Sequence, residues 1–292
     1  MHKYMRAVGF SKLERFKDED ELIRDVLGHY DYKKVVENKD GVLFAEISKE
    51  YAPYCGVTVC GSYDENNLFR LEYVFPYLWG AQVTNYEQVA IERHAAKESY
   101  AGACDALRVG TTLIFYLLNA GEYIDARQAT GQQDIQNAAV SLSALAESGS
   151  ILLPVAREQK KGPEDPRKVE RRNMLWNSAQ NGDEEAIESL TMEDIDTYTM
   201  LNRRVKREDI FTIVDSYFMP YGMECDIYNI LGEITDCQSL TNDATGEKMW
   251  QLGVVCNDVP LDVCLNASDL MGEPEAGRRF KGSIWLQGRV HF

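Results

Sequence analysis

Residues 226–256 read DIYNILGEITDCQSLTNDATGEKMWQLGVVC, and they contain the clearest structural signal in the chain. Two apolar runs, 226–237 and 248–256, flank the polar cluster TNDATG at 241–246. Runs rich in β-branched and aromatic residues on either side of Asn, Asp and Gly are typical of an antiparallel hairpin. This stretch therefore predicts a β-hairpin at the centre of the C-terminal part.

Further β-type runs lie on both sides of this hairpin, at residues 211–218, 261–265 and 280–292. A short helix is indicated at 267–271, before the last run. Five strands with one short helix suit a small closed barrel of the OB type. We therefore expect residues 211–292 to form an OB-like β-barrel domain.

The last of these runs alternates in a way that separates two faces. Ile284, Leu286 and Val290 fall on one face, and Trp285 falls on the other. Because successive side chains of a strand point to opposite sides, the three aliphatic residues should face the barrel interior. We expect Trp285 to lie outside the barrel and to pack against the helices predicted in the connector, residues 157–210.

Residues 1–156 predict an α+β domain in which an antiparallel sheet is covered by helices. A polar cluster at 64–67 is expected to join two strands as a hairpin. The expected strands are 4–10, 42–47, 56–60, 69–75, 86–94, 111–118, 140–145 and 151–155, and the expected helices cover 17–28 and 99–107.

Between these domains, residues 157–210 are densely charged and predict a helical connector. Its blocks of basic residues could form an anion or RNA site, or they could pair with acidic residues of adjacent helices. The fold class expected for the whole chain is therefore α+β: an N-terminal antiparallel sheet with helices, a charged helical connector and a C-terminal OB-like small β-barrel.

Composition limits the classes of partner. The 292 residues include 47 acidic and 31 basic ones, for a formal net charge of −16, which would repel a polyphosphate backbone. The longest apolar run, 112–118, is far shorter than the roughly 20 residues needed to span a bilayer. The first residues also lack the pattern of a signal peptide. We expect a cytoplasmic protein without a membrane segment. Whether the chain forms a homo-oligomer stays an open question.

Cysteine and histidine usage argues against a metal site. The seven cysteines contain no C-x-x-C pair and fall mostly in apolar runs, where a free cysteine behaves as a small buried residue. There are four histidines, and the common phosphate, dinucleotide, zinc and serine-hydrolase motifs are absent from the sequence. We expect neither a metal nor a cofactor.

Two groups of residues are nevertheless candidate sites. His94, Glu98 and Cys104 could form a Cys–His nucleophile pair or a general base, although a strand end whose polar groups face water explains them as well. The second group, Arg278, Arg279, Lys281 and Trp285, could bind single-stranded nucleic acid or an anion on a barrel surface. However, residues 211–292 contain twelve acidic and five basic residues, an unfavourable field for that role.

Four stretches resemble an uncharacterised bacterial family known as a domain of unknown function. They are MHKYMRAVGFS at 1–11, NGDEEA at 181–186, FMPYG at 218–222 and GEPEAGRRFKG at 272–282. The similarity covers the whole length, but no activity, cofactor or catalytic residue follows from it. The leading hypothesis is a non-enzymatic cytoplasmic protein-interaction module; nucleic-acid binding through the barrel and an enzyme using His94 and Cys104 are the alternatives.

Overall fold

A computed structural model describes residues 2–12, 16–84, 89–93, 99–106, 111–130, 139–154, 214–222 and 225–292. The chain divides into two compact units, one made of Met1–Leu153 with Ser216–Phe292 and the other of Pro154–Asp215. The predicted connector at 157–210 lies outside the described residues.

The first element of the unit is a four-stranded antiparallel sheet in chain order. Its strands are β1 (Tyr32–Glu37), β2 (Leu43–Ala52), β3 (Cys55–Tyr63) and β4 (Phe69–Leu78). The predicted hairpin at 64–67 is confirmed: Asp64 Oδ1 accepts from the backbone N–H groups of Asn66 at 2.9 Å and Leu68 at 3.0 Å. This turn joins β3 to β4 and fixes their register.

Helix α1 (Phe16–Gly28) packs on one face of this sheet. Leu22 and Val26 are buried, as the i, i+4 spacing of an amphipathic helix predicts. Asp25 fixes the contact, because its carboxylate accepts hydrogen bonds from Lys49 Nζ and Tyr51 OH, both at 2.7 Å.

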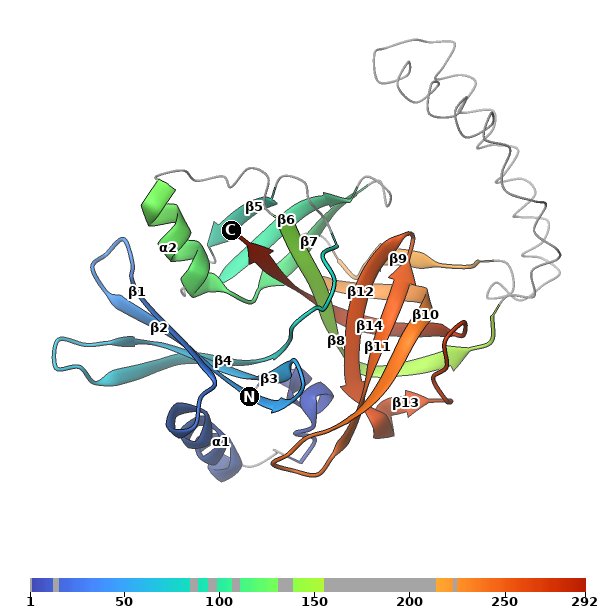
Figure 1. Ribbon diagram of the computed structural model, residues 1–292, viewed down its shortest axis with the longest axis horizontal. Helices are drawn as coiled ribbons and strands as arrows, with labels where there is room; N and C mark the ends of the chain where they lie inside the picture. The colour runs from blue at the N-terminus through green and yellow to red at the C-terminus, as the bar shows by residue number, and fades with distance from the viewer. Residues whose placement is uncertain are drawn as a thin grey trace, which may run out of the picture. The chain divides into compact units, whose positions relative to one another are not determined.

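The second element is a larger sheet that closes on itself (Figure 1). Strands β8 (Ala139–Leu152), β12 (Val259–Asn266), β11 (Lys248–Cys256), β10 (Ile227–Thr241) and β14 (Arg279–His291) pair in that order. Pairing of β14 with β8 completes a closed five-stranded barrel. The sheet is extended by β5 (Val89–Arg93), β6 (Tyr100–Ala106), β7 (Thr111–Leu117), β9 (Tyr217–Pro220) and β13 (Leu270–Met271).

The prediction that residues 211–292 form the barrel by themselves is wrong. Its fifth strand is β8, which comes from residues 139–152 and pairs with both β12 and β14. The expected hairpin at 140–155 is instead one continuous strand. Gly149 is not a turn residue: a Cβ there would lie 2.3 Å from the Phe280 ring, so the missing side chain makes room for that ring.

The α+β class is also wrong, because the described residues are mostly β. Their helices are α1, α2 (Ala120–Thr130) and two 3-10 turns, η1 (Lys3–Val8) and η2 (Ala267–Asp269). The expected helix at 99–107 is strand β6, and the expected strand at 4–10 is η1. The small residues of β6 leave room for an aromatic ring on the adjacent strand, because a Cβ on Gly102 would lie 2.2 Å from the Phe115 ring. Cross-strand packing of this kind outweighs local propensity.

Strand β14 connects the barrel to the four-stranded sheet. Gln287 is fully buried; its Oε1 accepts from Leu78 N at 3.1 Å and its Nε2 donates to Pro76 O at 2.9 Å. Both partners belong to β4. One amide side chain therefore satisfies two backbone groups of the neighbouring sheet and aligns the two layers.

Candidate functional site

Trp285 of β14 is buried, with 4% of its surface exposed. Its indole Nε1 donates to Asp226 Oδ2 at 2.6 Å, and its ring stacks on Tyr4 with a centroid distance of 5.4 Å. The rings of His2 and Tyr116 also contact it, at 4.3 Å and 5.0 Å. Trp285 therefore packs against η1 and β7, whereas the connector helices on which we expected it to dock lie outside the described residues.

The basic residues predicted beside Trp285 do not form one open surface with it. Arg278 donates from Nη1 to Glu273 O at 2.8 Å and pairs with the Glu275 carboxylate at 2.7 Å. Arg279 is buried, and its Nε donates to Leu153 O at 3.0 Å. Lys281 is half-buried on the same strand. Nucleic-acid binding by these residues stays a prediction.

The predicted catalytic group is described only in part. Cys104 is buried on β6, where it lies opposite Val89 and Leu113. His94 and Glu98 lie outside the described residues. The Cys–His pair therefore stays a prediction, and the helix on which Cys104 was expected is a strand.

Among the described residues, a row of apolar side chains crosses the exposed end of the four-stranded sheet. In β1 and β2, Val35 and Leu43 are each 40% exposed, and in β4 Leu71 is 48% exposed. The half-buried rings of Tyr63 and Phe69 lie between them, with centroids 5.5 Å apart. We call these five residues the outer patch.

The strand register makes the outer patch continuous. Leu43 is opposite Tyr63, which is opposite Phe69, and Leu71 is opposite Gly61. Directly opposed residues of antiparallel strands share a face of the sheet. Gly61 leaves a gap that the Phe69 ring fills, because a Cβ there would lie 2.6 Å from Phe69 Cζ. In Figure 1 the ends of these hairpins project beyond α1, which covers the same face nearer the barrel.

One cation is fixed at the margin of the outer patch. Lys33 Nζ donates to Tyr63 OH at 2.9 Å and lies 5.2 Å from the centre of the Tyr63 ring. The hydrogen bond that Lys33 donates to Tyr63 is the main cause of the raised pKa of Lys33. The Tyr63 ring is thus held in one orientation, which lowers the entropy lost when it contacts a partner.

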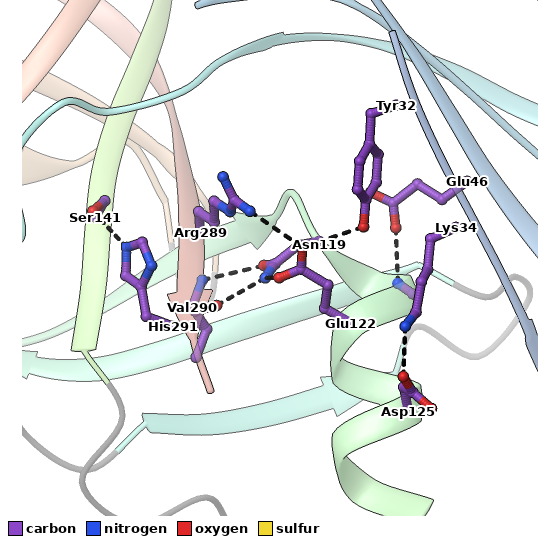
Figure 2. Close-up of polar contacts among 11 residues, drawn as sticks. Tyr32, Lys34, Glu46, Asn119, Glu122, Asp125, Ser141, Arg289, Val290 and His291 are labelled. Atoms are coloured by element: carbon purple, nitrogen blue, oxygen red, sulfur yellow. Dashed lines mark hydrogen bonds and ion pairs between the residues drawn. The ribbon is translucent and has the colours of Figure 1, made fainter. Parts of the chain in front are cut away.

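The opposite face of the same sheet carries a cluster of charged and polar groups (Figure 2). Glu122 of α2 accepts hydrogen bonds from Tyr32 OH at 3.2 Å and Asn119 Nδ2 at 2.7 Å, and it pairs with Arg289 of β14 at 3.2 Å. Arg289 also lies 5.2 Å from the Trp79 ring. Because its members come from several elements, the cluster links β1, β2, α2 and β14.

Glu46 of β2 is the most deeply buried member of this cluster, with 3% of its surface exposed. Burial raises its pKa from 4.5 to about 8; the hydrogen bond from Gly121 N and the charge of Arg289 oppose the rise, and Glu122 adds to it. Burial likewise raises the pKa of Tyr32, with further contributions from Glu122 and Glu46. Glu46 is therefore neutral at pH 7.

The described residues offer little for a metal or a cofactor. No group of three or more His, Cys, Asp or Glu side chains among them is placed to hold a metal ion. A cavity of about 150 Å³ is lined by Thr235, Pro260 and Asp262, among others. Ligand pockets usually exceed about 300 Å³, so this cavity suits water or a small ion. None of the described helices has the length and apolar character needed to cross a bilayer.

The sequence alone predicted neither the outer patch nor the cluster around Glu46 on the opposite face of the sheet. Strand β1 was not predicted, because its residues YKKVVE combine two lysines with apolar residues. Without β1, neither Val35 nor Tyr32 could be placed beside β2. The alternation of Leu43, Ala45 and Ile47 with Phe44 and Glu46 was the available signal, since it places a carboxylate among buried residues.

No curated protein and no solved structure matches this chain. A family model does match, over residues 5–288, which is almost the whole length. Its description is "Domain of unknown function, E. rectale Gene description (DUF3881)". The chain therefore belongs to this family.

Proposed function

We propose that this protein is a non-enzymatic, cytoplasmic protein-interaction module that binds its partner through the outer patch. The observation that carries the proposal is the exposure of Val35, Leu43 and Leu71 on adjoining strands, next to the Tyr63 and Phe69 rings. Single exposed apolar residues are ordinary, whereas a contiguous group marks an interaction site.

The charge of the chain favours one kind of partner. A formal net charge of −16 repels nucleic acid and also a second copy of the chain. A protein of neutral or positive net charge meets no such barrier. We therefore commit to a partner protein of that charge class that presents an apolar surface.

The shape of the outer patch supports a flat contact between two proteins. The patch spans all four strands of the sheet, and the Tyr63 and Phe69 rings contact each other within it. Aromatic anchors surrounded by smaller apolar contacts are typical of the residues that dominate binding energy. Tyr63 and Phe69 are the expected anchors, with Leu71 beside them.

The test begins with a photo-crosslinking amino acid, p-benzoylphenylalanine, in place of Leu71 in the native host cells. The same substitution at Met271 on β13, which is 74% exposed, is the matched control. We expect a crosslinked protein from the Leu71 position that the Met271 position does not give.

The crosslinked protein is then purified, and its affinity for the wild type, Leu71→Asp and Met271→Asp is measured by calorimetry. We expect Leu71→Asp to weaken binding at least about tenfold and Met271→Asp to leave it within about twofold. Equal binding by all three proteins would overturn the assignment to the outer patch. Substrate turnover by the purified protein would overturn the non-enzymatic part of the proposal.

A further inference from the structure

Besides the outer patch, the four-stranded sheet has a second feature that could have a role: a carboxyl group enclosed between the sheet and α2. Glu46 lies in the middle of β2, opposite Lys34 of β1 and Cys60 of β3. Its Oε2 accepts a hydrogen bond from Gly121 N of α2 at 2.8 Å. Figure 2 shows this contact beside the Tyr32 and Lys34 side chains.

Helix α2 approaches the sheet closely at this point because residue 121 is a glycine. A Cβ on Gly121 would lie 2.9 Å from Lys34 Cγ and 3.3 Å from Glu46 Oε2. The contact is thus between the backbone of the first turn of the helix and the Glu46 carboxyl group. Few water molecules can reach that carboxyl while α2 stays in place.

Charged and titratable groups face Glu46 from every element around it. Glu122 faces it from α2 and Arg289 from β14, while Cys60, Tyr73 and Tyr116 face it from β3, β4 and β7. From β1 it is faced by Tyr32, and Lys34 is its register partner.

The two cations of this set already have partners. Arg289 pairs with Glu122 at 3.2 Å, and Lys34 pairs with Asp125 at 2.5 Å. A negative charge on Glu46 would therefore lack a dedicated counter-ion and would lie near the charge of Glu122. The first-turn N–H of α2 favours a negative charge, but one hydrogen bond does not compensate for complete burial.

We propose that Glu46 is a proton-controlled latch for α2: its neutral carboxyl group holds the helix against the four-stranded sheet, and its ionisation loosens the helix. An ionised Glu46 regains hydration only when α2 moves away and admits water. The inference is independent of the outer patch, which lies on the other face of the sheet. It gives the protein a local opening that responds to pH.

Hydrogen exchange of backbone amides tests the latch, with rates corrected for the intrinsic effect of pH. Wild type, Glu46→Gln and Glu37→Gln are compared at pH 6 and pH 9. Glu37 lies in β1, is exposed, and is the register partner of Leu43 on the face away from α2, so it controls for the removal of an acidic side chain from the same sheet. We expect protection of α2 amides to fall at least about tenfold from pH 6 to pH 9 in wild type and Glu37→Gln.

In Glu46→Gln the same amides should change by less than about twofold, because the amide cannot ionise. Amides of β11 in the barrel should keep their protection in all three proteins. An equal fall in wild type and Glu46→Gln would overturn the latch. A fall in β11 that parallels that in α2 would also overturn it, because the whole protein would then be opening.

A second measurement keeps the proposal testable if Glu46→Gln does not fold. In wild type with ¹³C-labelled glutamate, one carboxyl signal should titrate with a midpoint near pH 8, and protection of α2 should fall with the same midpoint. If every glutamate carboxyl titrates below about pH 6, the latch is excluded.

Discussion

The two faces of the four-stranded sheet are unusual in opposite ways: one exposes apolar side chains, and the other buries a carboxyl group. On the outer face, Val35, Leu43 and Leu71 expose apolar surface to water. On the inner face, toward α2, Glu46 is enclosed with the Glu122–Arg289 ion pair beside it. The same four strands thus expose apolar side chains to solvent on one face and bury the carboxyl group of Glu46 on the other.

This difference shows what each face is suited for. A buried carboxyl group is costly unless it is neutral or paired, and Glu46 is neutral at pH 7. An exposed apolar side chain contributes little to the free energy of folding, because it stays in contact with water. It contributes favourably to the free energy of binding when a partner covers it. The inner face is therefore suited to coupling α2 to the sheet, and the outer face to binding another protein.

The largest effect should come from Gly61→Ala on the outer face. The new Cβ would lie 2.2 Å from Arg70 O, a backbone atom of the adjacent strand, and close to the Phe69 ring. We expect a loss of about 3 kcal/mol in the free energy of unfolding, measured by urea denaturation. Gly28→Ala is the control: no atom lies within 4 Å of its added Cβ, so stability should change little. Equal effects of both would contradict the packing of Phe69 over Gly61.

The next effect should come from Glu46→Gln and depend on pH. The folded-state pKa of about 8 exceeds the ordinary 4.5, so between these values the folded protein binds a proton that the unfolded chain has released. Wild-type stability should therefore fall as pH rises from about 5 to about 8 and then level off.

Because glutamine cannot ionise, Glu46→Gln should lack this component of the pH dependence. The full shift from 4.5 to about 8 would correspond to about 5 kcal/mol, but opening of α2 rehydrates the ionised carboxylate and limits the difference. We therefore expect Glu46→Gln to be about 2 kcal/mol more stable than wild type at pH 9 and close to it at pH 5, by thermal and urea unfolding at each pH. A constant difference between the two proteins across this range would contradict the raised pKa of Glu46.

Arg289→Met should have a smaller effect on the inner face. It removes the ion pair with Glu122, whose side chain is 29% exposed, and the contact with the Trp79 ring. We expect a loss of about 1 kcal/mol, because partly exposed pairs are weakened by water and salt. Part of that loss should disappear in 1 M NaCl, and a loss insensitive to salt would show that packing of the Arg289 stem is what matters.

The smallest effect on stability should come from Leu71→Ala on the outer patch. Leu71 is 48% exposed, so the change in free energy of unfolding should stay below about 0.5 kcal/mol. Binding of the partner should nevertheless weaken. A loss of stability above about 2 kcal/mol would mean that Leu71 is part of the folded core rather than of a binding surface.

Several local features could be predicted from residues alone. The hairpin after β3 followed from Asp64 and its neighbours, and the hairpin at 241–246 followed from its Asn, Asp and Gly residues. Both turns are built from hydrogen bonds between residues close in sequence: Asn242 Oδ1, for instance, accepts from Ala244 N at 2.9 Å and Thr245 N at 3.0 Å. The apolar face of α1 was likewise visible in the spacing of Leu22 and Val26.

The errors arose where distant residues decide. Residues Ser148, Gly149 and Ser150 have the composition of a turn, but the Phe280 ring packs on Gly149 and keeps β8 extended. In the same way, β6 has small residues because the Phe115 ring lies against Gly102. Neither aromatic residue is near its glycine in the sequence, so local patterns predicted a turn and a helix.

The sequence by itself determined the turns, the alternation within strands and the acidic net charge, because these depend on neighbouring residues or on composition. Tertiary structure alone decided that β8 closes the barrel, that Trp285 packs on η1, and which part of each face of the four-stranded sheet a helix covers. Whether a side chain is buried depends on which other segment packs against it, and not on its own segment alone. Alternation separates Glu46 from Leu43 onto opposite faces, but only the docking of α2 on one face encloses the carboxyl group and leaves the leucine in water.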